Sequence, residues 1–304
     1  MALRTRFEGP TWAALVGCYT VWSLCLWQAG QTSWWFLIAC AFAVALHSSL
    51  THEVLHGHPT RNRLVNEATV FLALGLFIPY RRFRDLHLRH HNDERLTDPF
   101  DDPESFYTPL SAWGRWAFAR RTVLQANGTL LGRMILGPPL SLWAFWRTDL
   151  SAMRSDPSIR GAWIRHILGL IPVLVAVAAA GVPIWIYVLC VAYPGMSLIM
   201  VRSFIEHRAT ENTDERTAVI EAHWFWCFLF LNNNFHSVHH DRPALAWYLI
   251  PAVWRRERNQ VLDRNGGYYL PGYGEVFRRW ALRRREPVVH PLLHRTGIDA
   301  GRDG

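Results

Sequence analysis

Three short segments of the chain gather histidines at spacings that suit metal coordination. On an α-helix, residues three and four positions apart lie on one face, so each segment can direct its imidazoles at a common point. Imidazole is a very common nitrogen ligand for transition metals, and eight imidazoles exceed what a single ion binds. The pattern therefore predicts a centre with two metal ions. The three segments are His52-Glu53-Val-Leu-His56, His87-Leu-Arg-His90-His91 and His236-Ser-Val-His239-His240.

The first segment also matches the H-E-x-x-H pattern of zinc proteases, in which the glutamate, here Glu53, is a general base. A zinc hydrolase needs three protein ligands and one open position, so most of the clustered histidines would have no function in it. A non-catalytic metal carrier is a second alternative, although it requires a polar path through the apolar segments, and none is evident. We favour the two-metal centre because it uses all eight histidines.

Two long stretches of the sequence, 9–52 and 166–201, contain no charged residue. A membrane-spanning helix needs about 20 apolar residues, so each stretch is long enough for two spans and a tight turn. The sequence therefore predicts an all-α integral membrane protein with two transmembrane helical hairpins. The expected spans, about four in all, lie near 11–28, 34–51, 165–180 and 184–202.

The distribution of arginine predicts the orientation of these spans. All 32 basic residues are arginine, which we attribute to codon bias, and the tips of both hairpins carry none of them. An excess of positive charge marks the cytoplasmic side of a membrane protein. Both termini and all three histidine segments are then cytoplasmic, in a helical cap that carries the di-metal site. The net charge of +8 fits basic loops beside anionic lipids, and no nucleic-acid motif is present.

We expect a single domain over residues 1–304. Its core lies at about 11–250, and 251–304 form a basic, peripheral C-terminal tail. His290 and His294 lie in this tail, where we expect surface positions.

The segments between the hairpins predict smaller elements. Residues 68–80 are apolar but too few to span, which favours an interfacial or re-entrant helix. Residues 92–109 are acidic and contain prolines, which favours a solvated loop. Residues 114–146 favour an amphipathic helix on the membrane surface, with tryptophans as interfacial anchors.

A ninth histidine would give the two metals four or five nitrogen ligands each. The candidates are His166, His207 and His223, and we favour His207 because the helix before it would carry it toward the three segments. Metal-bound imidazole usually donates its other ring N–H to a carboxylate or a carbonyl. By proximity in the sequence, the expected acceptors are Glu53, Glu206, Asp85 and Asp241.

An asparagine triplet, 232–234, precedes the third histidine segment at helical spacing. One of these amides, with Asn234 as our candidate, can contact a metal directly or through water. Helix capping is the alternative role for these side chains, and the sequence leaves both open.

These motifs, together with Arg202-Ser-Phe-Ile-Glu-His207-Arg and the two hydrophobic hairpins, resemble the membrane fatty acid desaturase/hydroxylase superfamily over about residues 11–250. The resemblance implies a non-haem di-iron centre at the cytoplasmic side of a four-helix membrane bundle. His207 is similar to the isolated histidine of the alkane monooxygenases, which also follows a glutamate. The iron ligands that the resemblance implies are His52, His56, His87, His90, His91, His207, His236, His239 and His240.

The resemblance further implies that O₂ is the co-substrate and that hydrogen is removed from an unactivated C–H bond. Desaturation of a fatty acyl chain or acyl lipid is the favoured reaction, and hydroxylation or ketolation of a lipid, alkane or carotenoid is the alternative. No dinucleotide fingerprint, haem module or cysteine cluster is present, so electrons must come from an external ferredoxin, rubredoxin or cytochrome. We expect a bacterial inner membrane as the location, and Arg81, Arg82 and Arg84 as candidates to meet a lipid headgroup.

Overall fold

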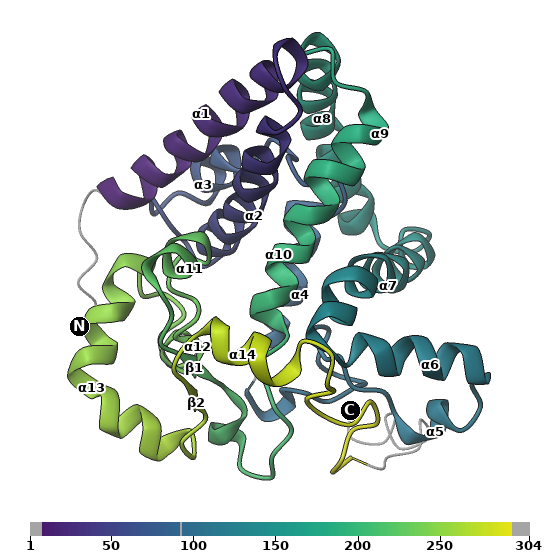
Figure 1. Cartoon of the computed structure of the whole chain (residues 1–304), viewed down its shortest axis with the longest axis vertical. Helices are drawn as coiled ribbons and strands as arrows, with labels where there is room; N and C mark the ends of the chain where they lie inside the picture. The colour runs from purple at the N-terminus through teal and green to yellow at the C-terminus, as the bar shows by residue number, and fades with distance from the viewer. Residues whose placement is uncertain (1–7, 92, 294–304) are drawn as a thin grey trace.

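The computed structural model describes residues 8–91 and 93–293 and shows a mostly helical molecule (Figure 1). Long helices form one part of it, and short elements form a cap at one end. The long helices are α1 (Gly9–Gln31), α2 (Phe36–Leu55), α7 (Leu130–Ala152), α8 (Pro157–Ala179) and a continuous helix made of α9 (Ile184–Tyr187), the π-turn η2 (Val188–Ala192) and α10 (Tyr193–Ser203).

The cap is built from shorter helices, single 3₁₀ turns and one pair of parallel strands. The first half of the chain supplies α3 (Arg63–Thr69), α4 (Tyr80–His90), η1 (Asp93–Arg95), α5 (Leu110–Trp113) and α6 (Phe118–Asn127). The second half supplies η3 (Thr213–Arg216), β1 (Val219–Ile220), α11 (Trp224–Leu229), α12 (His236–Asp241), η4 (Trp247–Leu249), α13 (Ile250–Arg264), β2 (Tyr269–Leu270) and α14 (Tyr273–Trp280).

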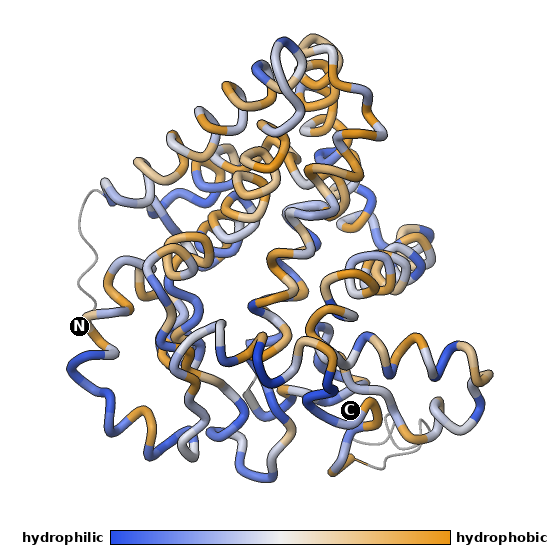
Figure 2. The backbone as a smooth tube through the Cα atoms, viewed as in Figure 1, coloured by the Kyte–Doolittle hydropathy of each residue, from blue (hydrophilic) through white to orange (hydrophobic). Residues whose placement is uncertain are grey.

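Among the described residues, three helices are long and apolar enough to cross a membrane: α2, α8 and the continuous helix Ile184–Ser203. The expected span at 11–28 corresponds to α1, which is of similar length and free of charge but is not among these three. Figure 2 shows apolar residues concentrated on these helices and polar residues concentrated in the cap. The structure therefore supports an integral membrane protein with at least three candidate spans.

Close backbone approaches hold the two hairpins together. A Cβ atom on Gly30, near the end of α1, would lie 1.6 Å from the carbonyl oxygen of Ala180 after α8. A Cβ atom on Gly195 of α10 would lie 2.6 Å from the side chain of Val44 on α2. Because small residues let helices approach closely, van der Waals packing can join helices that lack a hydrophobic driving force in lipid.

The apolar run at 68–80 is not the helix that we expected. Helix α3 ends at Thr69, α4 begins at Tyr80, and the residues between them are irregular. Irregular backbone beside membrane helices is tolerated only where its polar groups find protein partners. Four side chains donate hydrogen bonds of 2.8–3.0 Å to backbone carbonyl oxygens between Thr69 and Phe77. The donors are Tyr19, Trp146, His166 and Tyr187.

The segment expected as one amphipathic helix at 114–146 is divided into α5, α6 and α7. Helix α6 ends at Asn127 with Gly128 as its C-cap. The Thr129 hydroxyl then accepts the backbone N–H of Gly132 and caps the start of α7. These breaks allow the chain to change direction between helices.

The C-terminal region is packed against the core and is not peripheral. Strand β2 pairs in parallel with β1, and Trp254, Tyr273 and Val276 are buried. His290, expected at the surface, is 2% exposed, and its Nδ1 accepts the backbone N–H of Leu293 at 2.9 Å. His294 lies outside the described residues. Nonlocal backbone pairing explains this difference, since it leaves no periodic pattern in the sequence.

Candidate metal centre

Three helix ends and one loop bring the candidate ligands together. His52 is in the last turn of α2, and His56 is its C-cap, followed by Gly57 at a φ of +98° that ends the helix. Helix α4 carries the second segment in its last turn, and α12 consists almost entirely of the third. His207 lies just beyond α10, where its backbone bridges to Thr217.

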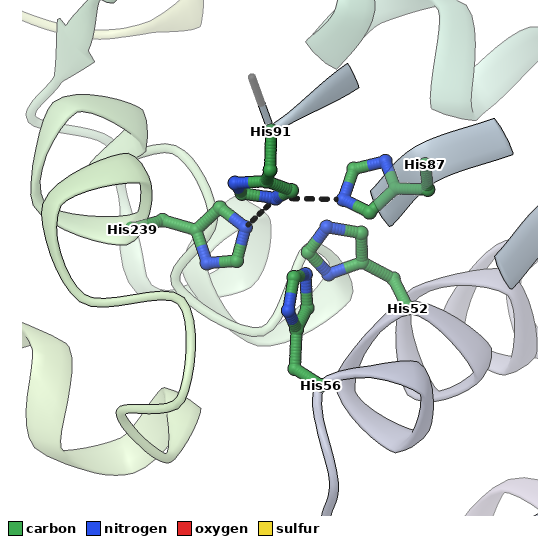
Figure 3. A group of neighbouring side chains, drawn as sticks. All are labelled: His52, His56, His87, His91 and His239. Atoms are coloured by element: carbon green, nitrogen blue, oxygen red, sulfur yellow. Dashed lines mark hydrogen bonds between the residues drawn. The ribbon is translucent and has the colours of Figure 1, made fainter. Parts of the chain in front are cut away.

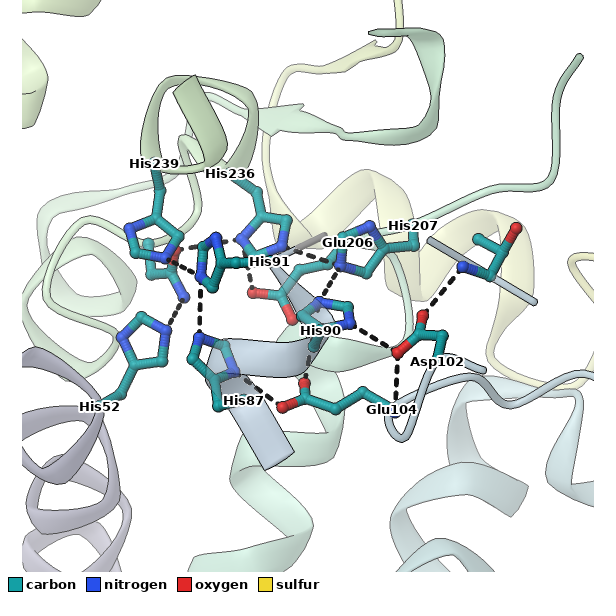
Figure 4. A network of polar contacts seen from close by, with 12 residues as sticks. His52, His87, His90, His91, Asp102, Glu104, Glu206, His207, His236 and His239 are labelled. Carbon is teal, nitrogen blue, oxygen red and sulfur yellow. Dashed lines mark hydrogen bonds and ion pairs between the residues drawn. The ribbon is translucent and has the colours of Figure 1, made fainter. Parts of the chain in front are cut away.

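The nine candidate histidines form two groups, in each of which one nitrogen per ring lies within 4.8 Å of the others. Figure 3 shows the first group, whose rings point toward one another from α2, α4 and α12. Figure 4 shows three members of the second group, His90, His207 and His236, beside members of the first. The first comprises His52, His56, His87, His91 and His239, and the second comprises His90, His207, His236 and His240.

The closest contacts within each group join Nε2 atoms. His91 Nε2 lies 3.0 Å from His87 Nε2 and 3.1 Å from His239 Nε2. His207 Nε2 lies 2.9 Å from His90 Nε2 and 3.0 Å from His236 Nε2. Two ligand nitrogens at right angles around one ion, each about 2.1 Å from it, are about 3.0 Å apart. The separations therefore match neighbouring ligands of a single ion.

The tautomers of these rings also favour a cation between them. The Nδ1 atoms of His87, His90 and His236 lie 2.7–3.1 Å from carboxylate or amide oxygens, so Nδ1 is the donor and a neutral ring exposes a lone pair at Nε2. When the rings of His90 and His236 are both neutral, His207 Nε2 faces two such lone pairs and can donate to only one of them. A bound cation removes the repulsion that would remain.

One buried nitrogen supports the same conclusion. Within the described residues, His56 Nε2 has no hydrogen-bond partner, although its ring lies 4.7–5.3 Å from the rings of four other histidines, centre to centre. A buried polar atom without a partner is costly, and such atoms are rare in folded proteins. The donor set, all imidazole nitrogen, suits iron, copper, nickel or zinc.

Burial keeps most of these rings in the neutral form that binds metal. Burial and the neighbouring imidazoles lower the pKa of His56 and His239 far below the ordinary value for histidine. Burial also opposes a charge on His90, but Glu104 and Asp102 outweigh it and raise the pKa of His90 to about 9. Metal binding at His90 therefore displaces a proton.

Two carboxylates from the acidic loop contact the second histidine segment. His90 Nδ1 lies 2.8 Å from Asp102, which is 7% exposed, and His87 Nδ1 lies 2.7 Å from Glu104. We expected this loop to be solvated, and the structure instead buries Asp102, whereas Glu104 contacts His87 with 36% of its side chain exposed (Figure 4). The sequence does show an acidic run directly after His90 and His91. The contacts of Asp102 with His90 and of Glu104 with His87 join residues 12 and 17 positions apart, so sequence proximity did not identify them.

Glu206 lies where sequence proximity placed it. Its Oε1 is 3.3 Å from His236 Nδ1 and 2.9 Å from Nε of Arg202, and both charged side chains are nearly buried. The ion pair fixes the carboxylate beside the third histidine segment. Glu206 can therefore orient His236 through its second nitrogen.

Other predicted acceptors have different partners. Glu53 Oε1 accepts the backbone N–H of Trp247 at 3.0 Å and lies 3.7 Å from His58, and the side chain is grouped with Glu8 and His58 and not with the clustered histidines. Asp85 pairs with its neighbour Arg84. Asp241 pairs with an arginine of α13, Arg264.

Asn233, and not Asn234, contacts the histidines. Leu231 and Asn232 both have positive φ angles, 47° and 56°, which reverse the chain before α12. This turn directs Asn233 Oδ1 to His236 Nδ1 at 3.1 Å, whereas Asn234 Nδ2 donates to the Ile220 carbonyl at 2.7 Å. Positive φ is strained for residues with side chains, and such strain is frequent at functional sites.

The remaining internal histidines lie outside both groups. His166 donates to the Leu76 carbonyl at 2.8 Å, and His223 is exposed at the start of α11. His47 is 3.0 Å from the Tyr19 hydroxyl. Of the three candidates for a ninth ligand, only His207 joins the clustered rings.

Two clusters of imidazoles at the end of candidate membrane helices define a histidine-rich metal centre of a membrane protein. The chain belongs to the fatty acid desaturase family, because the family model matches residues 27–272, a range that contains all nine histidines. None of the curated proteins searched matches the chain. Family membership indicates an oxidoreductase of the fatty acid desaturase kind.

Proposed function

We propose that this protein is a non-haem di-iron enzyme that uses O₂ to desaturate a fatty acyl chain or an acyl lipid. The observation that supports this most directly is the division of nine histidines into a group of five and a group of four. Family membership supports a lipid as the substrate. Bound iron would supply the redox change that activates O₂, which zinc cannot supply.

The protein residues hold and shield the centre in this proposal. All nine histidines serve as the iron ligands, with Asp102 and Glu104 holding the Nδ1 protons of His90 and His87. Asn233 does the same at His236, and Glu206 Oε1 lies 3.3 Å from the same nitrogen. Because most of these rings are buried, water has little access to the reacting positions.

The rest of the proposal concerns location and partners. We propose a bacterial inner membrane, with both termini and the metal centre on the cytoplasmic side. The arginine-rich cap supports this orientation. It requires an even number of spans, so α1 would cross the membrane in addition to the three candidate spans. We propose one domain over the whole chain. We also propose an external ferredoxin, rubredoxin or cytochrome as the electron donor, since the sequence contains no motif for a redox cofactor of its own.

Metal analysis of the purified protein tests the centre. We expect two irons per chain after expression in iron-supplied cells, measured by elemental analysis together with a protein assay. One zinc per chain and no iron would contradict the proposal and favour a zinc enzyme.

Mass spectrometry of lipids tests the reaction. The protein is expressed in a host with a compatible electron donor, and the lipids are compared with those from the His239→Ala variant. Loss of two hydrogen atoms from an acyl chain supports desaturation, and gain of one oxygen atom would assign the alternative, hydroxylation. Unchanged lipids despite bound iron and a working reductant would contradict both.

A further inference from the structure

Two arginines from distant parts of the sequence line one pocket in the cap. The pocket lies where the α6–α7 junction meets the segment after α14. Arg133 of α7 is 8% exposed, and the side chain of Arg285 is 6% exposed. Phe106, Leu124, Phe204 and Val288 provide apolar walls.

The charges of this pocket are not balanced. Arg285 Nη1 lies 3.3 Å from Glu286. Burial raises the pKa of Glu286 to about 7, so this carboxyl neutralises Arg285 only in part near neutral pH. Within the described residues, no carboxylate lies within ion-pair distance of Arg133, whose Nε donates to the Asn127 carbonyl at 3.1 Å. Burial and the charge of Arg285 lower the pKa of Arg133 to about 10, so it remains positive near neutral pH. At least one uncompensated positive charge therefore faces the pocket.

Aromatic contacts position the two guanidinium groups without neutralising them. The Phe106 ring centre lies 4.9 Å from Cζ of Arg133 and 5.3 Å from Cζ of Arg285. A cation–π contact is worth about 1 kcal/mol, well below the cost of burying an unpaired charge. An anion between the two groups would supply the missing attraction, and guanidinium binds carboxylate or phosphate in bidentate fashion.

The arginines that the sequence suggested for a headgroup are already paired. Arg81 binds Glu67 at 2.7 Å, Arg82 binds the buried Asp149 at 2.9 Å, and Arg84 binds Asp85 at 2.7 Å. An arginine that holds a carboxylate of its own protein has little remaining affinity for another anion. Arg133 differs from all three in this respect.

The pocket shares a wall with the metal centre. Nη2 of Arg285 donates to the backbone carbonyl of His207 at 2.5 Å. Phe204, which lines the pocket, lies three residues before His207 on the segment that leaves α10. The pocket is therefore connected to the second histidine group through Arg285 and the backbone of His207.

We propose that this pocket binds the anionic end, a carboxylate or a phosphate, of the lipid whose chain is oxidised. The assignment rests on the proposed function for its choice of a lipid. It specifies the substrate class as a charged acyl lipid and excludes an uncharged alkane or carotenoid. The apolar walls suit the first carbons beyond the charged group.

Binding by the iron-loaded protein in a non-ionic detergent tests the pocket. Palmitate, hexadecyl phosphate and hexadecanol share a chain length and differ in charge, and calorimetry gives their affinities. We expect at least one charged ligand to bind about tenfold or more tightly than hexadecanol, since hydrogen bonds to charged groups are strong. Equal affinity of all three for the wild-type protein would overturn the proposal, whatever the variants do.

Arg133→Gln should abolish the preference for charge while leaving the iron content unchanged. The matched control is Arg147→Gln, which removes an exposed arginine from the same helix and should keep the preference. Loss of the preference in both variants would indicate attraction by the basic surface and would overturn the pocket. Persistence of the preference in Arg133→Gln would also overturn it.

Inorganic phosphate distinguishes a lipid headgroup from a free anion. We expect millimolar phosphate to compete with the charged lipid for the wild-type protein and not for Arg133→Gln. Binding of phosphate that depends on Arg133 but displaces no lipid would assign the pocket to a free anion and overturn the lipid proposal. A preference for charged lipids without any lipid oxidation would contradict the proposed function but not the proposed pocket. Lipid oxidation without a preference for charged lipids would contradict the pocket but not the function.

Discussion

At the scale of single residues, the centre combines neutral ligands with charged partners one hydrogen bond away. Nine imidazoles bring no charge of their own, so two dications would place a large positive charge in a buried site. Asp102 and Glu104 supply negative charge through hydrogen bonds with Nδ1 atoms of ligand rings, and the carboxyl of Glu206 lies 3.3 Å from Nδ1 of His236. This arrangement fixes ring orientation and balances charge while leaving every metal contact to nitrogen.

Replacing one ligand should remove one metal. In His239→Ala the first group loses one of its five imidazoles, the one whose Nε2 lies 3.1 Å from His91 Nε2. The ion in this group then has one ligand fewer and binds more weakly. We expect the iron content to fall from two per chain toward one, measured by elemental analysis. His223→Ala removes an exposed histidine outside both groups and should keep both irons. An unchanged iron content in His239→Ala would contradict its assignment as a ligand.

Asp102 of the acidic loop should contribute to metal affinity through its contact with His90. Asp102→Asn weakens the contact that holds the Nδ1 proton of His90, so we expect metal affinity to fall by about tenfold to a hundredfold. Competition with a chelator measures this affinity. Asp101→Asn changes the adjacent residue, which pairs with Arg95 and contacts no histidine, and should leave affinity unchanged. Equal effects of the two variants would indicate a general role of loop charge.

At the scale of elements, the strand around β1 organises the second histidine group. Ala218 donates its backbone N–H to the Glu206 carbonyl, and the Ala218 carbonyl accepts the N–H of Ser237 at the start of α12. Val219 pairs with the β2 side through the Tyr268 carbonyl. One short extended segment thus fixes His207, the third histidine segment and the C-terminal region relative to one another.

The sequence predicted the elements whose signals are local. Helical spacing identified the three histidine segments, and absence of charge placed spans at 34–51 and 184–202, close to the observed Phe36–Leu55 and Ile184–Ser203. The pairing of β1 with β2, the inward turn of Asp102 and the burial of His290 all depend on residues far apart in the chain. Such contacts leave no periodic trace, so a single sequence cannot reveal them.

The irregular segment between α3 and α4 depends on hydroxyl groups from the membrane helices. Tyr187 donates its hydroxyl to the Leu74 carbonyl at 2.9 Å and accepts the indole N–H of Trp22 at 2.9 Å. Tyr187→Phe leaves both groups buried without a partner, which should cost about 2 kcal/mol. We expect the thermal unfolding midpoint in detergent to fall by a few degrees.

Tyr269→Phe is the control for this loss, because its hydroxyl binds Glu221 at the surface and should cost only about a few tenths of a kcal/mol. A Tyr187→Phe midpoint equal to that of this control would show that water or lipid satisfies the Leu74 carbonyl instead.

At the scale of the whole molecule, metal binding should connect the cap to the membrane helices. The ligands come from α2, α4, α12 and the loop after α10, and among these helices only α2 is a candidate span. Without metal, buried imidazoles face each other at about 3 Å in both groups.

Because a ligand that binds only the folded state stabilises it, removing iron with a chelator should lower the unfolding temperature. Hydrogen exchange should rise at 84–91, 204–208 and 233–241 and stay constant in α8, which carries no ligand. Identical unfolding temperatures and exchange with and without metal would mean that the fold holds these rings together by itself, and the cation would then have no structural role.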